Sequence, residues 1–232
     1  MPVITFSSPK GGAGKTTAAT IVATELAARG ATVTVIDADP NRNVVDWHAL
    51  GDVPGTLTVI GKVSEDSIIE DIEAASASSQ FVIIDLEGTA SLMVSYAISM
   101  SDLVVVPLQG SQLDAKQAVR QIKLIHAQEK VGRRSIPFFV LFTRTNPAIA
   151  PKTLRHIEEK FMEQGVPVLK TRLFDREAYR ALFSYGGTLE GLADKGVSNL
   201  DTAIKNARSL VAELIEHLRD AKAGKGKGRA AS

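Results

Sequence analysis

Apolar residues occur along the chain in two alternating patterns. In the first, four or five β-branched, aromatic or leucine residues follow one another directly, which is typical of strands buried on both faces of a sheet. This pattern predicts five strands, at residues 3–6, 32–36, 81–84, 103–106 and 138–142.

In the second pattern, apolar residues recur at three- and four-residue steps, as on one face of an amphipathic helix. It is clearest at residues 18–28, 114–130 and 197–222. The alternation of strands and helices predicts an α/β fold with a mostly parallel, twisted sheet flanked by helices on both faces. Because 232 residues can bury one substantial core, we expect a single domain over residues 1–220.

The end of the chain differs in composition. Residues 221–232 contain only alanine, glycine, lysine, arginine and serine. Without large apolar groups this segment cannot offset the entropy of ordering, so we predict a disordered basic tail.

Charge is distributed unevenly although the net charge is only +1. Residues 1–119 carry 6 Lys/Arg against 14 Asp/Glu, and residues 120–232 carry 21 against 12. The basic half favours a polyanionic partner or is simply a solvated face, and both interpretations stay open. The chain has no cysteine, which excludes disulfides, thiolate nucleophiles and cysteine-ligated metals. It begins without a secretory pattern and has no apolar run of about 20 residues, so we expect it in the cytoplasm.

Residues 9–17, Pro-Lys-Gly-Gly-Ala-Gly-Lys-Thr-Thr, follow the first predicted strand and open the first predicted helix. Glycines allow successive N–H groups to face phosphate oxygens, and the helix adds its positive end. The general phosphate-loop pattern would need glycine where this chain has Pro9. We nevertheless predict an ATP and Mg²⁺ site. Its predicted members are Gly11, Gly12, Ala13 and Gly14 around the phosphates, Lys15 at the β- and γ-phosphates, Thr16 at Mg²⁺ and Thr17 near the α-phosphate.

An acidic residue ends the strand predicted at residues 81–84. Asp85 stands where a Walker-B aspartate helps to hold Mg²⁺ at the carboxyl end of a buried strand.

Lys10 is a second lysine in the same loop. It is not needed to hold the subunit's own nucleotide and it repels Lys15, which suggests a role in another subunit. Here the sequence resembles the ParA/MinD-type deviant Walker A ATPases, whose Lys-Gly-Gly-x-Gly-Lys-Thr loop carries a signature lysine. The resemblance implies an ATP-sandwich homodimer in which Lys10 contacts the partner's nucleotide, and a slow, partner-stimulated ATPase.

Two further segments match that family. Asp37-Ala38-Asp39-Pro40 resembles its first switch, whose second aspartate helps to hold Mg²⁺ and the attacking water, although it could also be an ordinary turn. The implied catalytic residues are therefore Lys10, Lys15 and Asp39, and the implied metal ligands are Thr16, Asp39 and Asp85. After Asp85 the family usually continues with Thr-Pro, whereas this chain has Leu86-Glu87-Gly88. Glu87 brings a charge near the γ-phosphate or is a solvent-facing loop residue, and we favour the latter.

Residues 173–186 resemble the pattern of partition proteins, in which an arginine and a tyrosine flank a helix that ends at glycine. With the loop starting at residue 9, the chain is closest to small ParA partition ATPases without an N-terminal helix-turn-helix. That resemblance implies cargo partition over the nucleoid, non-specific duplex DNA and a ParB-like or centromere-binding adaptor. The candidate DNA contacts are Arg172, Arg176, Arg180, Lys205, Arg208 and the tail residues Lys222, Lys225 and Lys227.

Other functions stay open. A VirC-like DNA-transfer accessory ATPase would favour a specific DNA end and a relaxase. A MinD-like membrane-cycling ATPase would need a terminal amphipathic helix, but here glycine and lysine follow the last helix, so we expect no stable membrane insertion. A biosynthetic enzyme of the same superfold would need a dedicated substrate pocket. Thr143 and Asn146 follow a late predicted strand. In relatives the loops after such strands lie near the adenine and the dimer face, so the resemblance makes these two residues weak candidates for contacts to the base.

Overall fold

The computed structural model describes residues 1–88, 91–148 and 151–229, with side chains up to residue 223. The strands are β1 (Val3–Phe6), β2 (Val33–Ala38), β3 (Leu57–Ile60), β4 (Phe81–Leu86), β5 (Leu103–Leu108), β6 (Phe138–Thr145) and β7 (Leu173–Phe174). The helices are α1 (Lys15–Ala27), α2 (Asn43–Leu50), α3 (Ile68–Ser78), α4 (Leu92–Met100), α5 (Gln112–Gly132), α6 (Lys152–Glu163), α7 (Glu177–Tyr185), the 3₁₀ turn η1 (Glu190–Lys195) and α8 (Leu200–Arg229).

The strands form one sheet in the order β3-β2-β4-β1-β5-β6-β7, and every pairing is parallel. Asp85 on β4 lies opposite Phe6 on β1 and Asp37 on β2. The carboxyl ends of these strands therefore meet at one edge, where ligands bind in open α/β sheets. The predicted α/β class and parallel sheet are confirmed.

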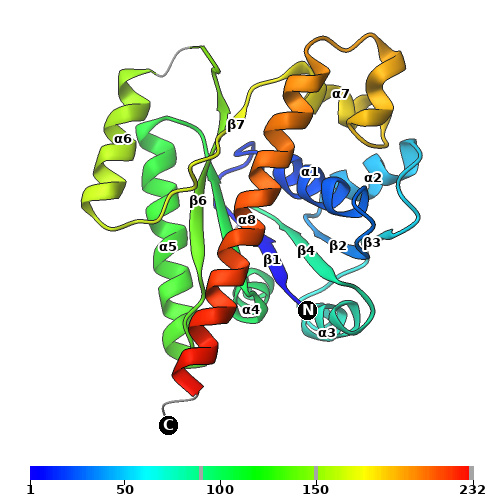
Figure 1. Cartoon of the computed structure of the whole chain (residues 1–232). Helices are drawn as coiled ribbons and strands as arrows, with labels where there is room; N and C mark the ends of the chain where they lie inside the picture. The colour runs from blue at the N-terminus through cyan, green and yellow to red at the C-terminus, as the bar shows by residue number, and fades with distance from the viewer. Residues whose placement is uncertain (89–90, 149–150, 230–232) are drawn as a thin grey trace.

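Helices cover both faces of this sheet (Figure 1). Alternate residues of one strand point to opposite faces, so Ile83 belongs to the core beneath α1, α2, α7 and α8, and Ile84 to the core beneath α3–α6. Eleven of the thirteen residues of α1 are buried, because the helix lies between the sheet and α8. Its small alanine and threonine side chains allow this close approach.

Helix α8 continues to Arg229, beyond the predicted helix end at residue 222 and into the predicted tail. Alanine and lysine are good helix formers, so the helix carries on past its last buried apolar residue, Leu218, despite interspersed glycines. Residues 230–232 lie outside the described residues, and the boundary at residue 220 stays a prediction. Within the described parts of the chain, no helix combines the length and apolarity that crossing a membrane requires.

Candidate functional site

The loop between β1 and α1 has an open, glycine-lined face. Gly12 and Gly14 have φ angles of 74° and 91°, which strain any residue with a side chain. At Gly11 and Gly12 the position of a Cβ atom would have no neighbour within 4 Å, so space lies above the backbone there. Helix α1 begins at Lys15, directly after the loop. The backbone is therefore shaped to receive an anion at a helix N-terminus.

Two side chains from distant strands support this loop from below. The hydroxyl of buried Thr143, on β6, donates to the Ala13 carbonyl at 2.6 Å and to the Leu108 carbonyl at 3.2 Å. Gln109 follows β5, and its Nε2 donates to the Gly12 carbonyl at 2.9 Å. The hydroxyl of Thr143 is thus engaged beneath the loop. The sequence did not predict that Gln109 supports the loop. Its only signal in the sequence is an amide side chain at the carboxyl end of a strand.

Lys15 is 5% exposed and lies among carboxylates. Burial lowers the pKa of its ammonium, while the charges of Asp85, Asp39 and Glu87 act in the opposite direction. Its Nζ donates to the Lys10 carbonyl at 3.4 Å. The ammonium group is therefore held inside the site, close to the loop backbone.

Asp85 is completely buried, and burial raises the pKa of its carboxyl to about 7. The nearby Thr16 hydroxyl and Lys15 ammonium oppose this rise, whereas the charges of Asp37 and Asp39 add to it. Apart from the nearby Thr16 hydroxyl, neither oxygen of Asp85 has a hydrogen-bond partner among the described residues. A buried carboxylate with no such partner other than a threonine hydroxyl fits the oxygen donors that Mg²⁺ takes.

Asp37, on β2, and Asp39, just after it, differ in role. Asp37 is buried, and its Oδ2 accepts hydrogen bonds from the Val44 and Val45 N–H groups, at 2.9 and 3.0 Å, at the start of α2. Burial raises the pKa of Asp37, and these bonds oppose the rise. Asp39 is half-buried, and its Oδ1 accepts from the backbone and side chain of Asn41 at 2.9 and 2.8 Å. Asp37 therefore anchors the segment, and Asp39 faces the site.

The segment after β4 lies against the phosphate loop. An added Cβ at Gly88 would lie 3.3 Å from the Gly11 nitrogen and 3.6 Å from Lys15 Nζ, so only glycine fits without displacement. Glu87 is half-buried and lines the same pocket, with its charge acting on Lys15. The expectation that Glu87 faces only solvent is wrong, because the close approach of Gly88 draws the segment inward. Thr89 and Ala90 lie outside the described residues.

Together these parts enclose a pocket of about 470 Å³. The predicted residues that line it are Gly11, Gly12, Gly14, Lys15, Thr16, Thr17 and Asp39. Ala13 and Asp85 are buried rather than on its wall. Sequence reasoning missed Asn41, Asn43 and Arg144, which also line it.

Lys10 is directed away from this pocket. Its Nζ forms an ion pair with Asp114, which is 2% exposed, while the side chain of Lys10 is 41% exposed. Asp114 lies in the first turn of α5, where its backbone N–H donates to Ser111 Oγ at 3.2 Å and its Oδ2 accepts from that hydroxyl at 2.7 Å. Lys10 therefore pairs with a carboxylate of α5, whereas Lys15 contacts the loop backbone near Asp85, Asp39 and Glu87.

Comparison with known proteins places this arrangement in a family. A model described as "VirC1 protein" matches residues 1–219. The chain belongs to the VirC1 family. Protein ParA of Rhizobium radiobacter is 40% identical to it over 221 residues, covering 95% of this chain and 99% of that protein.

Solved structures agree on the fold. An ATP complex of a Cyanothece McdA variant has a TM-score of 0.69 at 17% identity, covering 91% of this chain and 96% of that one. The cell-division protein MinD of Aquifex aeolicus has a TM-score of 0.66 at 19% identity, covering 92% and 98%. The P-loop NTPase fold and the resemblance to ParA/MinD-type ATPases, close to VirC-like proteins, are confirmed.

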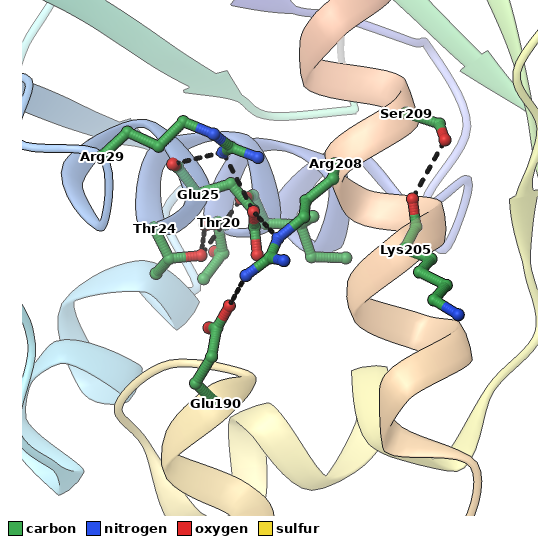
Figure 2. A network of polar contacts seen from close by, with 9 residues as sticks. Thr20, Thr24, Glu25, Arg29, Glu190, Lys205, Arg208 and Ser209 are labelled. Carbon is green, nitrogen blue, oxygen red and sulfur yellow. Dashed lines mark hydrogen bonds and ion pairs between the residues drawn. The ribbon is translucent and has the colours of Figure 1, made fainter.

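In this VirC1-family chain, carboxylates already engage three of the arginines predicted to contact DNA. Arg208 bonds to Glu190 at 2.9 Å and lies 3.5 Å from buried Glu25, which also binds Arg29 at 3.0 Å. Figure 2 shows Arg208 reaching from α8 between these two acids, while Lys205 has no ion pair there. Burial and Glu190 raise the pKa of Glu25, and the two arginines lower it. Arg208 therefore joins α8, α1 and η1.

The other three candidate arginines lie around β7 and in α7. Arg172 binds both oxygens of Glu158, at 2.6 and 2.7 Å. Arg180 pairs with Asp175 and Glu177, and Arg176 lies 5.3 Å from the Phe174 ring centre while donating to the Thr202 hydroxyl at 3.0 Å. Arg176 and Arg180 line a second cavity of about 360 Å³, whose wall also includes Gly14 and Thr17.

Proposed function

We propose that this VirC1-family chain is a ParA-like ATPase that forms an ATP-sandwich dimer, binds duplex DNA non-specifically and positions a plasmid, chromosome segment or other cargo. ATP hydrolysis acts as the switch. The observation that carries the proposal is the different placement of two lysines in one loop: Lys15 inside the pocket, and Lys10 directed outward to Asp114. A lysine that serves only its own nucleotide has no reason to be held outside the pocket.

The nucleotide would bind with its phosphates over Gly11–Lys15, where the open backbone and the Lys15 ammonium meet their negative charge. Its base would enter the neighbouring cavity, which Phe174 and Phe183 line with aromatic surface. The ATP complex of McdA supports this choice of ligand. When bound, Mg²⁺ would neutralise phosphate charge, held by Thr16, Asp39 and Asp85.

Hydrolysis would require a water aligned with the γ-phosphate. Asp39 is half-buried, lines the pocket and is fixed by Asn41, which suits it to orient that water. Lys15 of the same subunit and the partner subunit's Lys10 would stabilise the charge on the phosphate oxygens. Because Lys10 must first arrive from a second subunit, turnover would be slow until a partner favours the dimer.

The rim of the pocket suits a subunit interface. Leu92 begins α4 and is 57% exposed, and Leu113 in the first turn of α5 is 72% exposed. Both helices follow strands whose carboxyl ends form the site edge. Exposed large apolar residues at this edge favour its burial against another subunit.

DNA binding would be electrostatic and independent of sequence. Lys205 is exposed and has no ion pair among the described side chains, so it is the best placed of the candidates. The partly exposed Arg176 would add charge directly, whereas Arg172, Arg180 and Arg208 would first have to leave their carboxylate partners. A dimer doubles this weak surface, which would make DNA binding depend on ATP. We propose nucleoid association in the cytoplasm and a ParB-like or centromere-binding adaptor on this basis.

The decisive experiment measures co-sedimentation with an unrelated duplex DNA without nucleotide, with ADP and with ATP. We expect salt-sensitive binding only with ATP. Lys15→Ala should abolish nucleotide binding and therefore DNA binding. Lys10→Ala should still bind nucleotide but should no longer dimerise. Lys205→Ala should weaken DNA binding, with exposed Lys130→Ala as the matched control. Equal DNA binding in all three nucleotide states would refute the switch.

A second candidate is the VirC-like DNA-transfer accessory ATPase, which the family match favours. It would share the dimer but bind one DNA end preferentially and require a relaxase. Competition between a transfer-origin fragment and an unrelated duplex of equal length separates the two functions. Flotation with liposomes only in ATP would instead support a MinD-like membrane cycle.

A further inference from the structure

A groove runs between α5 and α6, on the face of the sheet opposite α8. It has a volume of about 340 Å³ and an apolar floor made by Ala115, Val119, Ile157 and Phe161. In Figure 1 the two helices lie side by side at the left of the molecule. None of these residues belongs to the nucleotide pocket.

The rim of this groove is basic. Lys116, Arg120 and Lys123 follow one another at four- and three-residue steps along α5, and Lys160 stands on α6. All four are exposed, and no ion pair engages them within the described part of the chain. Like charges at this spacing weaken a helix, so the row costs α5 stability.

The acidic residues of α5 and α6 do not neutralise this row of basic side chains. The two acids of α5 are used elsewhere: Asp114 binds Ser111 and Lys10, and Glu129 accepts from the Ile136 N–H at 2.8 Å. On α6, Glu158 binds Arg172, and the other acids of that helix do not line the groove. The positive charge around the apolar floor is therefore left for an external group.

We propose that the α5–α6 groove is a docking site for an acidic amphipathic helix of a partner protein. Protein interfaces combine an apolar centre with a polar rim, and this groove has that organisation with one sign of charge. DNA fits less well, because phosphates gain nothing from an apolar floor. A second copy also fits less well, because acidic α3 exposes a single large apolar side chain, Ile69. The inference goes beyond the proposed function and requires no nucleotide.

The groove extends along α5 from Gln112 to Lys123, about 16 Å at 1.5 Å per residue, or roughly three helical turns. A helix of about 11 residues would fill this length. The probe is a fluorescent amphipathic peptide of about 16 residues, longer than the groove so that it can form a helix, with leucines on one face and glutamates beside them. Its control peptide carries lysine in place of each glutamate. Fluorescence anisotropy with the full chain should give a Kd of about 10–100 μM for the glutamate peptide, rising with salt, and no binding of the lysine peptide.

Two variants locate the site. The double variant Arg120→Glu with Lys123→Glu should bind the glutamate peptide about tenfold or more less tightly, and should bind the lysine peptide. Lys130→Glu with Lys152→Glu makes the same change of charge on the same helices outside the groove, and should alter binding by less than about twofold. Circular dichroism confirms that each variant is folded. A third variant, Val119→Asn, should bind the glutamate peptide less tightly, although the charge of the groove is unchanged.

Any of four results would overturn the proposal. The glutamate peptide could fail to bind the wild-type chain, or bind both charge variants equally. A duplex DNA could bind wild type and lose affinity only in the groove variant, which would make the surface a nucleic-acid contact. Sedimentation could show self-association that only the groove variant loses, which would make a second copy the occupant.

Discussion

The ion pair between Lys10 and Asp114 predicts that one substitution strengthens the proposed dimer. If Lys10 crosses to the partner's nucleotide, each subunit must first break this pair. Asp114→Asn removes the charge but keeps the size of the side chain and an oxygen that accepts from Ser111. We expect Asp114→Asn to dimerise more tightly with ATP than the wild-type chain does.

The exposure of Lys10 determines how much the Asp114→Asn substitution should strengthen the dimer. The side chain of Lys10 is 41% exposed, so water screens the pair although Asp114 is buried. A screened pair is worth about 0.2–1 kcal/mol, and formation of one dimer breaks two of them. The dimerisation constant should therefore rise by about 2- to 30-fold, at about 1.4 kcal/mol for each factor of ten. High salt should reduce the difference.

The assay is sedimentation equilibrium with a non-hydrolysable ATP analogue, at low and high salt. Ser111→Ala is the matched control: it removes the cap of α5 but leaves the Asp114 carboxylate for Lys10. It should lower thermal stability by an amount typical of a lost cap, about 1 kcal/mol, without tightening the dimer. A folded Asp114→Asn chain that dimerises no better than wild type refutes the reasoning. A wild-type chain that stays monomeric with ATP refutes the sandwich dimer instead.

Two more substitutions test the site. Asp85→Asn should stabilise the chain without ligands at pH 8 by about 1–3 kcal/mol. In the wild-type chain the pKa of Asp85 is about 7, so between about pH 4 and 7 the folded state binds more protons than the unfolded state. The stability of the wild-type chain therefore falls as pH rises through that range. Urea unfolding should show a larger gain at pH 8 than at pH 5, because the cost of Asp85 grows over that range, and an equal gain at both pH values contradicts the assignment. Thr143→Val leaves the Ala13 carbonyl without its 2.6 Å bond. It should cost about 1–2 kcal/mol of stability and weaken binding of an ATP analogue, and unchanged values for both would show that the loop needs no support.

The sequence predicted those parts of the site that lie within one short segment. The loop from Lys10 to Thr17 and the acid at the end of β4 are local patterns, and the parallel sheet brings them to one edge. The supports of the loop are not local: Thr143 lies 130 residues from Ala13, and Gln109 lies 97 from Gly12. No pattern within a single segment indicates which distant side chain reaches a given carbonyl.

Edge strands and charge partners escaped prediction for similar reasons. Strand β3 has four residues and β7 has two, and both lie at edges of the sheet, where a short apolar run gives little signal. Arginines in a basic half of the chain indicate a charged surface, but Arg208 serves to join three elements through Glu25 and Glu190. Composition predicts the number of charges and leaves their partners undetermined.

The pocket concentrates features that lower the stability of the chain without ligands. Asp85 is buried with no hydrogen-bond partner but a threonine hydroxyl in the described part of the chain, Lys15 is buried with a lowered pKa, and Gly88 adds no packing where it touches the loop. In the proposed function the first two costs would be relieved on binding, because a cation would neutralise the carboxylate and phosphates would pair with the ammonium. Nucleotide binding would therefore stabilise the folded chain. Such a site would suit the proposed switch, because bound nucleotide would hold the loop and the segment after β4 more tightly than the empty site does.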